Sequence, residues 1–177
     1  MRRALLVGID AYGFGRLEGC VADAAGLAEV LATNADRSPN WRADVLLGSD
    51  DQPSITRDVL RDRLSQLFKN ARDTDLLFFF AGHGGQTMWG ADLVTQDATE
   101  NSLGVSMNDL ITLANDSPAR SVTLILDCCF SGDVGALPGL QAAAVAEPFR
   151  LTKTVLRENV TVMAASRAIE TSAELVV

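Results

Sequence analysis

A cysteine and a histidine, far apart in the sequence, have the chemistry that nucleophilic catalysis requires. His83 is the only histidine of the chain and stands among glycines, in the run Gly-His-Gly-Gly. Cys129 follows Cys128 in the run Asp-Cys-Cys-Phe-Ser-Gly. A thiol becomes a strong nucleophile when a neighbouring base takes its proton, and the resulting imidazolium can protonate a leaving amine. These residue types therefore predict a Cys–His dyad that cleaves an amide bond.

Both reactive residues follow apolar runs that predict strands buried on both faces of a sheet. The runs are LLFFFA at residues 76–81 and SVTLILD at residues 121–127. In open α/β sheets the active site lies beyond the carboxyl ends of the strands. If these two strands are neighbours, the imidazole and a thiol face each other at one edge. Because side chains alternate along an extended chain, we expect one of Cys128 and Cys129 to be structural and the other catalytic.

The rest of the chain alternates short apolar runs with segments of helical periodicity. Strands are predicted at residues 3–8, 43–47 and 160–165, and helices at 22–32 and 107–114. Another helix is expected to begin with Ser54 as N-cap, and its apolar face comprises Val59, Leu60, Leu64, Leu67 and Phe68. This alternation predicts an α/β fold, a three-layer sandwich whose mostly parallel central sheet is flanked by helices.

The composition excludes several classes of protein. With 177 residues, the chain suits one domain, and 47% hydrophobic against 21% charged residues is typical of a soluble globular protein. A formal net charge of -8 argues against a nucleic-acid partner. No apolar run is long enough for a signal peptide or a membrane helix. Three cysteines, two of them adjacent, make no disulfide framework. We therefore expect a reducing, cytoplasmic setting without a membrane partner.

Four segments resemble motifs of the caspase–metacaspase family, most closely its bacterial metacaspase-like (orthocaspase) members. Residues 78–86 resemble the family's strand and Ser-Gly-His-Gly motif, and residues 127–132 resemble its Asp-x-Cys-His-Ser-Gly motif. Residues 17–24 resemble the Leu-x-Gly-Cys-x-x-Asp-Ala motif, and residues 164–167 resemble the strand end after the cysteine motif. Two positions depart from the family: Ala81 stands where many members have serine, and Phe130 where many have histidine.

The resemblance implies a caspase-like cysteine endopeptidase in which Cys129 is the nucleophile and His83 its acid/base partner. The separation of these residues is close to the ~50 residues expected for caspases. By resemblance, the backbone amides of Gly84 and Cys129 form the oxyanion hole. Cys20, Asp23 and Asp127 then line a pocket for arginine or lysine, because a buried carboxylate pair recognises a guanidinium through charge-assisted hydrogen bonds.

The resemblance also predicts how the domain is organised and which partners it has. Residues 1–177 correspond to the large-subunit portion of the catalytic domain, and the C-terminal small subunit is expected to be absent from this chain. The expected partners are a protein or peptide substrate with a basic residue before the scissile bond, and the chain's own small subunit. Residues 134–158 are rich in glycine, proline and alanine and predict a mobile or processed loop, in which self-cleavage would use Arg150, Lys153 or Arg157.

Calcium activates many metacaspases, so aspartates are candidate calcium ligands in a chain that resembles this family. Asp92, Asp97, Asp109 and Asp133 could offer oxygens, but they form no compact loop with the spacing of a calcium site. No metal or cofactor is therefore predicted, and calcium activation stays open.

Two other functions are compatible with a caspase-like chain. One is an inactive scaffold or recruitment module, against which the presence of both His83 and Cys129 argues. The other is a Cys–His hydrolase that acts on small amides, which cleavage assays on peptides and small amides would distinguish.

Overall fold

Within the described residues, the central sheet has five parallel strands in the order β2-β1-β3-β7-β8. The computed structural model describes residues 1–87, 89–128 and 156–164. Each sequence-predicted strand is present with its ends moved by one residue or so, because long apolar runs mark buried strands clearly. The strands are β1 (Arg2–Ile9), β2 (Arg42–Gly48), β3 (Asp75–Ala81), β7 (Ser121–Asp127) and β8 (Val160–Ala164).

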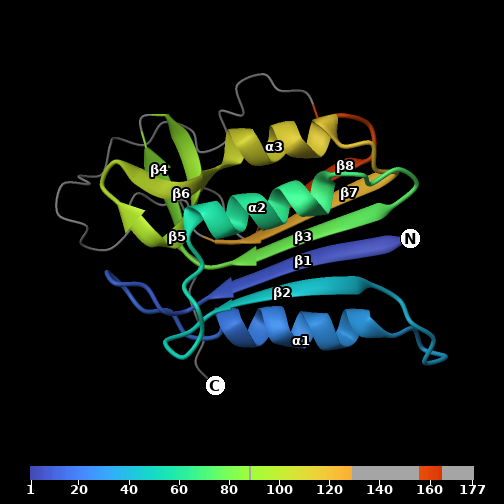
Figure 1. Ribbon diagram of the computed structural model, residues 1–177, viewed down its shortest axis with the longest axis horizontal. Helices are drawn as coiled ribbons and strands as arrows, with labels where there is room; N and C mark the ends of the chain where they lie inside the picture. The colour runs from blue at the N-terminus through green and yellow to red at the C-terminus, as the bar shows by residue number, and fades with distance from the viewer. Residues whose placement is uncertain (88, 129–155, 165–177) are drawn as a thin grey trace.

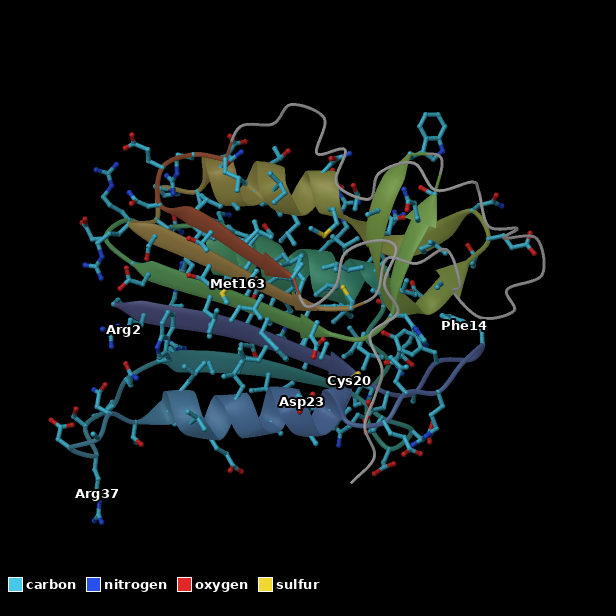
Figure 2. All side chains as sticks on the ribbon, turned by 180° about the vertical axis from the view of Figure 1, so that it is seen from behind. Arg2, Phe14, Cys20, Asp23, Arg37 and Met163 are labelled. Atoms are coloured by element: carbon cyan, nitrogen blue, oxygen red, sulfur yellow. The ribbon has the colours of Figure 1, made fainter. Side chains whose placement is uncertain are left out.

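Three helices in the described part of the chain cover the two faces of this sheet. They are α1 (Cys20–Ala32), α2 (Arg57–Phe68) and α3 (Met107–Asp116). Along β1, Leu5 and Val7 pack on the side of α2, whereas Ala4 and Leu6 pack on the side of α1. Figures 1 and 2, seen from opposite sides, show α2 and α3 on one face and α1 on the other. The α/β sandwich predicted from the sequence is therefore confirmed, and no described helix is both long and apolar enough to cross a membrane.

The start and apolar face of α2 differ from the prediction. Its N-cap is Thr56, whose hydroxyl accepts a hydrogen bond from the Val59 amide at 3.3 Å, and not Ser54. Val59 itself is 37% exposed, while the other four residues of the predicted face are buried. Position 59 precedes position 60 by about 100° around the helix. Val59 therefore lies at the margin of the stripe that Leu60 and Leu64 bury.

A second sheet, which the sequence did not predict, follows β3. Its antiparallel order is β4-β5-β6, with bounds β4 (Gly84–Thr87), β5 (Gly90–Thr99) and β6 (Ser102–Ser106). Figure 1 shows this sheet beside the carboxyl ends of the central strands. Glycine-rich β4 and polar β5 lack the apolar pattern of a buried strand. The glycines after His83 begin strand β4, in which Gly84 and Gly85 are buried.

Candidate active site

The strands before the predicted dyad residues are neighbours. Ala81 at the end of β3 pairs in register with Asp127 at the end of β7. The Gly82 amide continues this pairing by donating to the Asp127 carbonyl at 3.3 Å. His83 and the segment after Asp127 thus leave the sheet at the same edge, as the two motifs predicted.

The two adjacent cysteines differ in what the structure describes. Cys128 is 2% exposed and packs in the core cluster of the α2 side, which is the environment of a structural thiol. Cys129, the predicted nucleophile, lies outside the described residues, as do residues 134–155 of the predicted loop and residues 165–167 of the last motif. Arg157, a predicted self-cleavage residue, is described, and its guanidinium donates to the carbonyls of Ser117 and Ala119 at 2.6 and 3.1 Å.

The half-buried imidazole of His83 is held in a defined orientation. Its Nε2 lies 3.1 Å from the carbonyl oxygen of Gly15. A carbonyl oxygen only accepts hydrogen bonds, so Nε2 carries the proton in this contact, and in the neutral imidazole Nδ1 is then the accepting nitrogen. This tautomer allows Nδ1 to act as a proton acceptor toward a thiol.

Two aromatic rings from the loop after β1 pack against this imidazole. The ring centroids of Tyr12 and Phe14 lie 4.7 and 5.7 Å from that of His83, and Figure 2 labels Phe14 in this loop. The hydroxyl of Tyr12 accepts from the His83 amide at 3.1 Å. The motifs did not point to these residues, although the run Tyr-Gly-Phe-Gly begins three residues after the buried strand β1 ends.

Asp10 holds the N-terminus of α1, which carries two predicted pocket residues. Gly19 is the N-cap residue, with φ 105°, and has no side chain to accept from the first helical amides. The Asp10 carboxylate accepts instead, from the Cys20 amide at 2.9 Å and from the Val21 amide at 3.4 Å. A Cβ at Gly8 would lie 2.1 Å from the Cys20 carbonyl oxygen, so glycine allows the helix to approach β1 this closely.

The three residues predicted to line the specificity pocket lie at this edge of the sheet. Cys20 is buried, Asp127 is half-buried and Asp23 is exposed in the first turn of α1; Figure 2 labels Cys20 and Asp23 there. Burial, and then the negative charge of Asp23, raise the pKa of the Asp127 carboxyl. The expectation of a buried carboxylate pair is wrong for Asp23, because its place on the helix leaves its side chain in solvent.

Gly84, predicted to donate to the oxyanion, is buried at the first position of β4 and pairs with Leu93 of β5. It directly follows His83 in the chain. The second predicted donor, the amide of Cys129, is outside the described residues. The oxyanion hole therefore stays a prediction.

Of the four candidate calcium ligands, the three aspartates that the structure describes form no group placed to hold a metal ion. Burial, and then the charge of Asp109, raise the pKa of Asp92 to about 6, while the charge of Arg57 opposes this shift. Asp97 accepts from the Arg57 amide at 2.9 Å and from the Thr95 hydroxyl at 2.7 Å. Asp133 lies outside the described residues, and within those residues no three His, Cys, Asp or Glu side chains are placed to bind a metal ion.

Comparisons with known proteins bear on the family and the fold of this chain. The family model of the metacaspase, peptidase C14 domain matches residues 2–138. Protein GSU0716 from Geobacter sulfurreducens, known from a crystal structure, is 22% identical with a TM-score of 0.53, which shows a shared fold. The match covers 75% of this chain and 52% of that one, so this chain spans about half the length of its structural relative. No curated protein matches the sequence.

Proposed function

We propose that this chain, which belongs to the metacaspase family of C14 peptidases, is a cysteine endopeptidase in which Cys129 and His83 form the dyad. The observation that carries the proposal is the orientation of the imidazole. Its Nε2 is bound to the Gly15 carbonyl, and His83 follows β3 at the sheet edge where the chain also leaves β7. An imidazole held in this way is suited to remove a proton from a nearby thiol.

Each step of the reaction then has a residue to perform it. Nδ1 of His83 accepts the thiol proton, and the Cys129 thiolate attacks the carbonyl carbon of the scissile peptide bond. The amides of Gly84 and Cys129 stabilise the oxyanion. The imidazolium protonates the leaving amine, and water, deprotonated by the same imidazole, hydrolyses the thioester.

The substrate residue before the scissile bond is proposed to be arginine or lysine. Asp127 supports this choice because its pKa is raised by burial and by Asp23. A half-buried carboxylate in such a setting gains free energy when a cation approaches it. Arginine should be preferred to lysine, since its planar fork can donate to two carboxylates where an ammonium acts as a point charge.

Peptide cleavage by four proteins tests the dyad. The wild type, Cys129→Ala, His83→Ala and the matched control Cys128→Ala are compared on peptides with arginine before the scissile bond. The full-length natural protein is used, with calcium and with a chelator. We expect the first two substitutions to lower kcat/KM by more than about a thousandfold, given what each part of such a dyad contributes. Cys128→Ala should keep most of the activity.

The control decides the assignment of the nucleophile. If Cys128→Ala abolishes cleavage while Cys129→Ala spares it, with circular dichroism showing both folded, the nucleophile is Cys128. Activity that survives His83→Ala would exclude a Cys–His dyad altogether. Cleavage of small amides but not of peptides would favour the small-amide hydrolase.

A further inference from the structure

We propose, on the basis of the proposed dyad, that Tyr12 is a positioning residue that sets the place of His83 through its hydroxyl and through its ring. A general base is effective only when its accepting atom is held within hydrogen-bond reach of the proton that it removes. In this molecule, several contacts that hold His83 come from residues 12–15, the loop that follows β1.

The hydroxyl of Tyr12 ties the main chain of His83 to the second sheet. It accepts from the His83 amide at 3.1 Å and donates to the Val94 carbonyl at 3.3 Å. The Val94 amide in turn donates to the His83 carbonyl at 3.0 Å. His83 stands where β3 ends and β4 begins, so these bonds fix the backbone at the junction of the two sheets. Without the hydroxyl, the His83 amide would lose this acceptor and the Val94 carbonyl this donor.

The ring of Tyr12 restricts the plane of the imidazole. It is tilted by 58° to the His83 ring, and Phe14 packs beside both rings, 5.3 Å from Tyr12. The carbonyl of Gly15, in the same loop, accepts the hydrogen bond from Nε2 of His83. The loop is itself anchored, because Gln96 donates to the Ala11 carbonyl at 2.6 Å. The orientation of the imidazole therefore follows from the conformation of this loop.

Gly82 shows how closely the phenol is built into the turn before His83. A Cβ at this position would lie 2.5 Å from the Tyr12 hydroxyl oxygen, nearer than atoms in real proteins approach. Part of the cost of Gly82→Ala should therefore depend on the presence of that oxygen. This gives a test that is independent of removing the hydroxyl.

Tyr12→Phe removes the hydroxyl and keeps the ring, so it tests positioning with little change in packing. We expect kcat to fall about 10- to 100-fold while KM stays within about twofold, because a small displacement of a catalytic group slows the chemical step more than it weakens substrate binding. The second readout needs no activity. His83 is the only histidine, so its Nε2–H signal in NMR is unambiguous. Its exchange with water should become at least about tenfold faster.

Ser117→Ala is the matched control at the opposite end of the strands. The buried Ser117 hydroxyl also bridges two backbone groups, donating to the Phe68 carbonyl at 3.2 Å and accepting from the Ala119 amide at 3.3 Å. Its loss should lower the melting temperature but leave kcat and the His83 signal unchanged. Gly82→Ala should cost less stability in the Tyr12→Phe background than in the wild type.

These measurements separate the inference from the function that it rests on. If the wild type cleaves no peptide, the proposed function fails, and the NMR exchange rate still decides the role of Tyr12. If Tyr12→Phe changes neither kcat nor the exchange rate, Tyr12 does not position His83, whatever the protein cleaves. The inference would also be overturned if Gly82→Ala cost the same stability in both backgrounds. It would likewise be overturned if Ser117→Ala changed kcat and the exchange rate of the His83 Nε2–H as much as Tyr12→Phe does.

Discussion

Replacing Asp127 by asparagine keeps the size of the side chain and removes its charge, so it isolates the electrostatic part of the proposed basic specificity. The same change at Asp23 is the natural comparison, because the two carboxylates lie close enough for the charge of Asp23 to raise the pKa of Asp127. They differ in burial: Asp127 is half-buried, whereas Asp23 is exposed. We therefore expect Asp127→Asn to weaken the recognition of arginine more than Asp23→Asn does.

The difference in burial sets the expected magnitudes. An exposed ion pair contributes about 0.2–1 kcal/mol, so Asp23→Asn should lower kcat/KM on arginine peptides by no more than about fivefold. A hydrogen bond to a charged group away from solvent contributes about 1.5–3 kcal/mol. Asp127→Asn should therefore lower kcat/KM roughly 10- to 150-fold.

The assay uses two peptides that differ only in having arginine or its neutral isostere citrulline before the scissile bond. The wild type should prefer arginine strongly, and Asp127→Asn should remove most of this preference by slowing arginine cleavage alone. A loss after Asp23→Asn as large as that after Asp127→Asn would refute the argument from burial. Equal cleavage of both peptides by the wild type would refute the acidic pocket itself.

Thermal unfolding separates a specificity role of Asp127 from a structural one. A raised pKa means that the folded protein binds the proton of Asp127 more tightly than the unfolded chain does. The stability from this group is thus present at pH values below the ordinary pKa and is lost as the pH rises through the raised one. At pH 7 the ionised carboxylate is unfavourable, so Asp127→Asn should leave the melting temperature unchanged or higher. A marked fall would mean that Asp127 is structural.

Two further predictions concern carboxylates that act on the fold. Asp10→Ala should lower the free energy of unfolding by about 0.5–2 kcal/mol in urea titrations, because α1 loses the group that caps its first amides. Asp10→Asn keeps an acceptor and should lower it less. Equal losses of stability in the two variants would mean that Asp10 does not act as a cap. Asp92, with its pKa of about 6 raised by burial and by Asp109, stabilises the fold fully only below its ordinary pKa and loses this contribution as the pH rises through about 6. Asp92→Asn should therefore raise the melting temperature at pH 8 and flatten its pH dependence between pH 4 and 7, and a lower melting temperature at pH 8 would contradict the predicted sign.

The central sheet and the common edge of the two motifs followed from the sequence alone. The run at residues 76–81 is apolar over its whole length and buried throughout, as a strand covered on both faces is, and the run at residues 121–127 is largely apolar, with buried and half-buried positions alternating. Parallel strands end at the same edge, so two motifs at strand ends predict one site. A continuous apolar run can be recognised from adjacent residues alone, which is why local patterns predicted the buried strands.

The second sheet and the caps depended on tertiary contacts. Strand β4 has no apolar pattern, and its pairing with β5 holds it in place. At α2, the side chain of Thr56 and not that of Ser54 accepts the hydrogen bond from the Val59 amide. Both residue types are good N-caps and they stand two residues apart, so the sequence alone does not choose between them. At α1, the capping carboxylate comes from Asp10, outside the helix and its immediate start.

The amino-acid sequence was enough to predict the reactive residue types and the sheet edge at which they lie, whereas the packing of separate elements sets how the imidazole and the carboxylates are held. The hydrogen bond from His83 to Tyr12 joins residues 71 positions apart, and no pattern within either segment reports on the other. The exposure of Asp23 likewise depends on how α1 docks on β1 through Gly8. Such contacts form when separate elements pack together, so the geometry of the site is a property of the whole domain.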